Sequence, residues 1–151
     1  MANGALHSVV GATSGIGVAV YRARDQDLLR IILEAAGGGL GGYIGGRLPD
    51  LLEPAAGNPN HRNLAHSWLA CGGTALGVAN AAAWEHRLRA KAELLHRERL
   101  GVADPWQQAV LWVQEILLRL LVGFLTGAVA GYASHLVLDA CTPQGLPLLA
   151  R

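Results

Sequence analysis

Histidine and carboxylate side chains that can bind a metal ion occur at four separate places along this sequence. His135 and Asp139 are four residues apart, so both project from one face of a helix. Neutral imidazoles together with carboxylates form a ligand set typical of zinc sites. If distant segments meet in the fold, these side chains could hold a divalent metal ion. The four groups are His7, Asp50 with Glu53, His61 with His66, and His135 with Asp139.

Helices that cross a membrane are the elements expected to position these groups. The chain has 151 residues, of which 52% are apolar and only 15% are charged, whereas a soluble domain carries about 25% charge. Residues 1–21, 63–84 and 120–138 contain no Asp, Glu, Lys or Arg. Each stretch is long enough to cross the ~30 Å hydrocarbon core of a bilayer as a helix. A weaker candidate at 28–48 carries charges near its start and would need neighbouring helices around it.

Glycine recurs at every fourth position within these stretches, for example at Gly11 and Gly15 and again at Gly123 and Gly127. In lipid, small residues at this spacing let helix backbones approach closely and pack. The sequence therefore predicts an all-α, membrane-embedded, up-down four-helix bundle with glycine-rich helix packing, forming a single domain over residues 1–151. A soluble helical bundle with a glycine-rich core is the alternative.

Helix boundaries are predicted from capping residues and prolines. The fourth helix would run from Pro105 to about Asp139, which is too long for one simple crossing. Its first half is therefore expected outside the membrane or in its interface. Residues 85–99 are expected to form the exposed end of the third helix and a loop. The predicted caps are Asp25, Asn63 and Asp104 for the second, third and fourth helices, and Pro49 is predicted to close the second.

The distribution of basic residues predicts which side of the membrane each loop faces. In an up-down bundle, the segments 22–30 and 85–104 lie on one side and together carry eight Lys and Arg residues, against three on the other side. Basic loops favour the cytoplasm. The opposite end of the bundle is therefore expected to face outward.

All four metal-binding groups fall at that outward end, although the helices were assigned without reference to them. Asp50 and Asp139 would cost several kcal/mol at a membrane edge without a partner. The only nearby cations in the sequence are Arg47 and Arg62. A metal ion is therefore the expected partner for these carboxylates.

Other classes of protein are disfavoured. A net charge of +1 gives no broad electrostatic surface for nucleic acid, so no nucleic-acid partner is expected. The segment GATSGIG at 11–17 looks like a nicotinamide-binding loop, but no strand and helix alternation follows it. Helix packing is the expected role of these glycines. Cys71 and Cys141 form neither a zinc motif nor a disulfide framework, and either small apolar packing or pairing with each other stays open.

Three motifs carry a resemblance to a known family. They are GRLPD at 46–50, HRNLAHS at 61–67 and GYASHLVLDACTPQG at 131–145. Together with the early His7, they resemble the YdjM-type proteins, LexA-regulated and inner-membrane-associated metal-dependent hydrolases. The resemblance implies a multi-pass helical protein of the bacterial inner membrane with a metal-dependent hydrolytic site.

Roles follow from this resemblance as hypotheses. A divalent metal, Zn²⁺ first, would activate a water molecule against a small phosphoester or lipid substrate, with membrane lipid as a partner. Glu53 is either a base or an extra ligand, or else a solvated loop carboxylate. Arg62 either holds a phosphate or is a surface cation that contacts lipid headgroups. The number of proposed ligands is larger than the four that one tetrahedral ion binds, but it suits two ions that share a carboxylate. The six proposed ligands are His7, Asp50, His61, His66, His135 and Asp139.

Two other classes of function remain open. The same side chains could bind or conduct metal ions without catalysis, although transport sites tend to lie near the bilayer midplane. The glycine-rich helices could instead serve a structural membrane subunit, and they allow a homo-oligomer.

Overall fold

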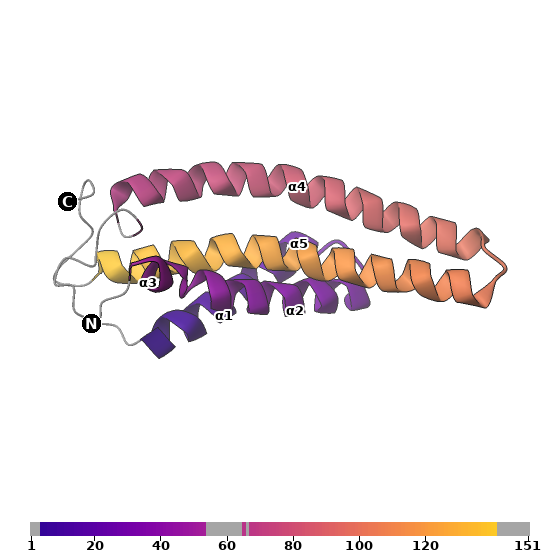
Figure 1. Ribbon diagram of the computed structural model, residues 1–151, viewed down its shortest axis with the longest axis horizontal. Helices are drawn as coiled ribbons and strands as arrows, with labels where there is room; N and C mark the ends of the chain where they lie inside the picture. The colour runs from indigo at the N-terminus through magenta and orange to yellow at the C-terminus, as the bar shows by residue number, and fades with distance from the viewer. Residues whose placement is uncertain (1–3, 54–64, 66, 142–151) are drawn as a thin grey trace.

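The computed structural model describes residues 4–53, 65 and 67–141, and every regular element in that part of the chain is a helix (Figure 1). This confirms the predicted all-α class, and the segment GATSGIG lies inside a continuous helix. The helices are α1 (Gly4–Ala23), α2 (Leu28–Gly45), the short α3 (Leu48–Leu52), α4 (Trp68–Gly101) and α5 (Pro105–Ala140).

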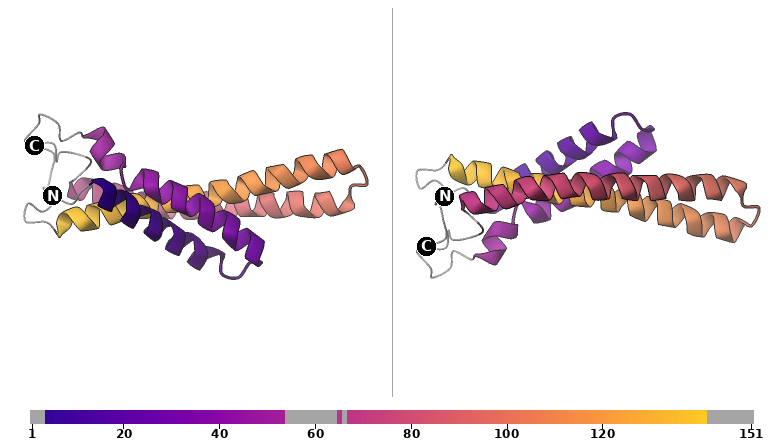
Figure 2. Two further views of the ribbon diagram at one scale, coloured as in Figure 1. Left: turned by 90° about the horizontal axis from the view of Figure 1, so that it is seen from below. Right: turned by 90° about the horizontal axis from the view of Figure 1, so that it is seen from above.

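The four long helices run alternately up and down, as predicted. Helices α1 and α2 form a short hairpin that packs on one half of the longer α4–α5 hairpin, and the tip of the longer hairpin extends beyond them (Figures 1 and 2). Helices α1, α2 and α5 pack closely on one another, whereas α4 packs mainly on α5. The start of α5 therefore extends beyond the α1–α2 hairpin, whereas Glu115 and Arg119, later in its first half, are buried against the other helices.

Glycines allow the close packing of α1, α2 and α5. A Cβ atom at Gly15 or at Gly127 would collide with the carbonyl oxygen of Gly38. One helix of the bundle departs from this rule. In α4, a Cβ atom at Gly73 or Gly77 would meet nothing within 4 Å. Glycine-rich packing is thus confirmed for three helices, and α4 lies farther from its neighbours.

Polar side chains are buried in this bundle while large apolar ones are exposed. Glu34 and His135 are fully buried, whereas Val9 and Leu40 are 60% and 59% exposed. Large exposed apolar surfaces mark contact with a membrane or with another protein. Among the described helices, α1 and α5 are long and apolar enough to cross a membrane. Helix α4, which covers most of the predicted stretch 63–84, does not meet that test.

Several predicted helix boundaries are wrong, and each has a local cause. Asp27 caps α2 in place of Asp25, because its side chain accepts the backbone N–H of Arg30. Helix α2 ends at Gly45, so Pro49 does not close it and instead lies in the first turn of α3. The predicted Asp104 cap is confirmed by its bond from the N–H of Trp106.

Two further boundaries concern α4. Ser67 caps this helix through a bond from the N–H of Ala70, while the predicted cap Asn63 lies outside the described residues. Residues 85–99 are helical throughout and form no loop, because they are rich in Ala, Leu, Glu and Arg, which favour helix. Within this segment Glu85 is buried, so it is not simply an exposed end.

Candidate metal centre

Three of the predicted ligands meet at one end of the bundle. His7 lies in the first turn of α1, and His135 and Asp139 lie near the end of α5. The three side chains are 3%, 0% and 3% exposed. Burial at this level is rare for a carboxylate unless a cation or hydrogen bonds accompany it.

The ligand atoms of these three side chains face one another. The Nε2 atom of His7 is 3.9 Å from Oδ1 of Asp139, and the Nε2 atom of His135 is 3.4 Å from Oδ2 of the same carboxylate. One ligand atom from each residue lies within 4.8 Å of the other two. Ligand atoms bonded at about 2.0–2.2 Å to one tetrahedral Zn²⁺ lie roughly 3.3–3.6 Å apart. Small side-chain adjustments would therefore fit the three onto one ion.

A backbone carbonyl fixes the orientation of the His135 ring. Its Nδ1 atom lies 2.8 Å from the carbonyl oxygen of Gly46. A carbonyl only accepts, so Nδ1 carries the proton and donates. Metal-binding histidines typically use this second contact to hold the ring and to turn the other nitrogen toward the ion. The absence of a side chain at Gly46 also lets α1 pass close by, since a Cβ atom there would crowd the carbonyl oxygen of His7.

The other ring nitrogen of His135 faces two carboxylates. Asp50 of α3 brings Oδ1 to 3.7 Å from Nε2, and Asp139 approaches from the other side. With the proton on Nδ1, a neutral ring offers only a lone pair at Nε2, and carboxylate oxygens offer lone pairs as well. A cation or an additional proton between these atoms removes their repulsion. The donor set fits a divalent metal ion, and Asp50, which is 43% exposed, opens it toward solvent.

The remaining predicted residues divide into two groups. His61, Arg62 and His66 lie outside the described residues. Glu53 is described, and its Oε1 atom accepts the backbone N–H of Ala65 at 2.9 Å. It follows Asp50 by three residues at the end of α3, and its role as a base or extra ligand stays a prediction.

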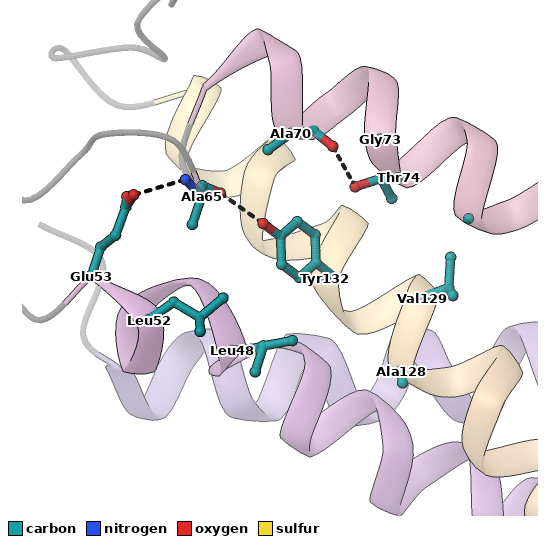
Figure 3. A pocket seen from close by; sticks show the side chains of 11 residues that line it. Leu48, Leu52, Glu53, Ala65, Ala70, Gly73, Thr74, Ala128, Val129 and Tyr132 are labelled. Carbon is teal, nitrogen blue, oxygen red and sulfur yellow. Dashed lines mark hydrogen bonds between the residues drawn. The ribbon is translucent and has the colours of Figure 1, made fainter. Parts of the chain in front are cut away.

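A large apolar cavity next to this centre was not predicted. It has a volume of about 740 Å³ and lies between α3, α4 and α5 (Figure 3). Its few polar groups include Glu53 and the hydroxyl of Tyr132, which donates to the carbonyl of Ala65 at 2.9 Å. Tyr132 precedes His135 by three residues, so one face of α5 carries both. That spacing was the sequence signal that could have linked Tyr132 to the site.

Comparison with known proteins bears on the identity of the chain. The model of the family described as YdjM inner membrane protein matches residues 1–150. The chain belongs to the YdjM family. No curated protein and no solved structure matches it.

The structure of this YdjM-family protein contains a network of buried ion pairs that was not predicted from the sequence. Arg119 of α5 is 2% exposed and its guanidinium contacts Gln26 and Glu34, while Arg89 of α4 pairs with Glu34 and Glu85. The network lies around the start of α2, at the opposite end of the α1–α2 hairpin from His7 and Gly46. Its partners come from four helices, so spacing along the sequence could not reveal them.

Basic residues that were counted in the predicted cytoplasmic loops take part in this YdjM-family network. Arg22 pairs with Glu85 at 2.7 Å, and Arg30 pairs with Glu93 at 2.9 Å. Burial raises the pKa of the Glu93 carboxyl, but the charges of Arg30 and Arg97 outweigh it and hold this pKa below 4.5. Part of the positive charge on this side is thus neutralised within the protein. Cys71 and Cys141, whose pairing was left open, are both free.

Proposed function

We propose that this chain is a membrane-bound, metal-dependent hydrolase that acts on a phosphoester or lipid. The observation that carries the proposal is the buried meeting of His7, His135 and Asp139 from opposite ends of the chain. A divalent cation held there, with Zn²⁺ the first candidate, would supply a Lewis acid and lower the pKa of a water molecule toward 7.

The residues of the chain divide the remaining work. The contact with Gly46 holds the His135 ring so that Nε2 faces Asp139 and Asp50. Asp50 is the most exposed member and lies where a substrate could enter. Glu53, three residues after Asp50, would accept a proton from water near the centre. Arg62, with its planar guanidinium, would hold a phosphate group, and His61 and His66 would complete a second ion site.

The position of the centre along the helices favours hydrolysis over ion transport. His7 lies in the first turn of α1, and Asp139 lies in the last turn of α5. Transport sites tend to be formed near the middle of the bilayer. With all four long helices crossing the inner membrane and the basic segments in the cytoplasm, the centre would open on the outer face.

Metal content and hydrolysis, measured on the same preparations, test the proposal. The full chain is purified in detergent beside His135→Ala, Asp139→Asn and His86→Ala, the last being an exposed histidine far from the centre. We expect stoichiometric metal and phosphodiester or lipid hydrolysis in the wild type and in His86→Ala, and loss of both in the other two. Metal retained in both centre variants would remove the site, and metal without turnover on any ester class would favour the non-enzymatic ion-binding alternative.

A further inference from the structure

The apolar cavity between α3, α4 and α5 is lined on two sides by small residues. Its wall on α4 consists of small residues that include Gly73, Thr74 and Gly77, and its wall on α5 includes Ala128 and Val129 (Figure 3). At Gly73 and Gly77 a Cβ atom would meet nothing within 4 Å. These two positions therefore open onto the cavity and carry no side chain that would fill it.

Polarity is distributed unevenly along this cavity. Glu53, Ala65 and Tyr132 place a carboxylate, a backbone carbonyl and a hydroxyl at one end, and the lining residues farther along α4 and α5 are apolar or small. Two helices connect the polar end of the cavity to the metal centre. Helix α3 carries Asp50 next to the centre and Leu52 in the cavity wall, and α5 carries Tyr132 one turn before His135.

We propose that this cavity holds one hydrocarbon chain of a membrane lipid, whose headgroup lies at the metal centre. The proposal rests on the proposed function and names its substrate class, a lipid with an ester or phosphoester headgroup. The volume of about 740 Å³ lies within the range of about 300–1,000 Å³ that is usual for small-molecule sites. A molecule with an apolar tail and a polar head matches the distribution of polarity along the cavity.

The surroundings of the cavity favour lipid over a protein segment. Leu48 and Leu52 in its lining are 38% and 62% exposed, so this part of the rim is apolar. A hydrocarbon chain would enter from such surroundings without first leaving water. The rim also lies on helices of a family described as an inner membrane protein. A helix from a second copy of the chain is the competing occupant, and the test below separates the two.

Photo-crosslinking with a lipid tests the occupant directly. The full chain is placed in vesicles of phosphatidylethanolamine and phosphatidylglycerol that contain phosphatidylglycerol with a diazirine in one acyl chain. After irradiation, mass spectrometry locates the labelled residues. We expect labels on the cavity walls, around Thr74 and Val129. Unlabelled cavity walls, as expected if a helix from a second copy of the chain fills the cavity, or labels spread evenly over the outer faces of α1 and α2, would overturn the proposal.

Three glycines of α4 provide variants inside the cavity and a matched control outside it. Gly73→Leu and Gly77→Leu put side chains into the cavity, while Gly72→Leu makes the same change on the same helix outside its lining. A Cβ atom at any of the three meets nothing within 4 Å, and leucine favours helix over glycine, so all three variants should fold. We expect labelling of the cavity to fall about tenfold in Gly73→Leu and Gly77→Leu, which corresponds to about 1.4 kcal/mol, and to be unchanged in Gly72→Leu. Equal labelling in all three variants would contradict the proposal.

This measurement is independent of metal and turnover. His135→Ala should lose metal and hydrolysis and still show the crosslinks in the cavity. Crosslinks without any hydrolysis in the wild type would leave the lipid site standing and remove the proposed enzyme. Lipid hydrolysis that continues at full rate in Gly73→Leu and Gly77→Leu would remove the lipid site and leave the enzyme.

Discussion

The imidazole rings of His7 and His135 are stacked, with centroids 3.9 Å apart and an interplanar angle of 26°. This contact joins the start of α1 to the end of α5 and leaves Nε2 of each ring directed toward Asp139. His7 therefore has two separable features, a flat ring that packs on His135 and a nitrogen atom that would bind the proposed metal ion.

His7→Phe should separate the packing role of this residue from metal binding. A phenyl ring keeps the stack but offers no ligand atom, so we expect Tm to stay close to that of the wild type while bound metal is lost. His7→Ala should lose metal and also about 0.5–1.5 kcal/mol of stability from the missing ring pair. Thermal unfolding in detergent and metal analysis provide the two readings. Full metal content in His7→Phe would show that His7 is only a packing residue.

Gly42 tests how strongly the bundle depends on close backbone contacts. A Cβ atom there would collide with the carbonyl oxygen of Gly11, and the backbone of Gly131 packs against Gly42 from α5. We expect Gly42→Ala to cost about 1–3 kcal/mol through overpacking and to weaken metal binding, because α1 and α5 carry the ligands. Gly17→Ala is the matched control. Its Cβ atom meets nothing within 4 Å, so a gain of about 0.5–1 kcal/mol in helix stability is expected. Equal unfolding free energies for the two variants would contradict this account.

Features that depend on local chemistry or on overall topology could be predicted from the sequence. Asp104 followed by Pro105 marks a helix start by itself, and the structure begins α5 there. The meeting of His7, His135 and Asp139 follows once four helices alternate in direction, because all three residues lie near helix ends. Of the six predicted ligands, the structure describes His7, Asp50, His135 and Asp139 and brings their side chains together. His61 and His66 lie outside the described residues, and metal binding by any of the six stays a prediction.

Features that depend on three-dimensional register could not be predicted. Gly73 and Gly38 are both glycines in charge-poor stretches, yet only Gly38 contacts a neighbouring helix. Spacing alone does not tell a packed glycine from one that leaves a cavity. Arg119 could likewise be seen as an unusual charge in a long apolar helix, but its partners Gln26 and Glu34 lie on segments far away in the sequence. The two acidic residues Asp25 and Asp27 are equally good caps by type, and only the turn geometry decides between them.

Arg119 and Arg97 provide a matched comparison of buried and exposed ion pairs. Arg119 is 2% exposed and contacts Glu34, which is fully buried. Arg119→Ala should cost about 1.5–3 kcal/mol, because the buried Glu34 carboxylate loses one of its two arginine partners and keeps Arg89. Arg97 is 75% exposed and pairs with Glu93, so Arg97→Ala should change stability by less than about 1 kcal/mol. Chemical unfolding in detergent gives both values. Similar losses in the two variants would mean that the Arg119 network is hydrated rather than buried.

The sidedness of the bundle is testable with a thiol that the chain already has. Cys141 is exposed and follows α5 at the same end as Asp139, whereas Glu98 lies near the tip of the α4–α5 hairpin. In a Cys71→Ala background, a maleimide that cannot cross membranes is applied to intact cells in which only the inner membrane is a barrier. We expect Cys141 to react from outside. A Glu98→Cys, Cys141→Ala variant should react only after the membrane is opened, because basic residues near the hairpin tip favour a cytoplasmic position. The reverse pattern would place the metal centre in the cytoplasm, and reaction of both thiols before opening would mean that the helices do not separate these two residues across a membrane.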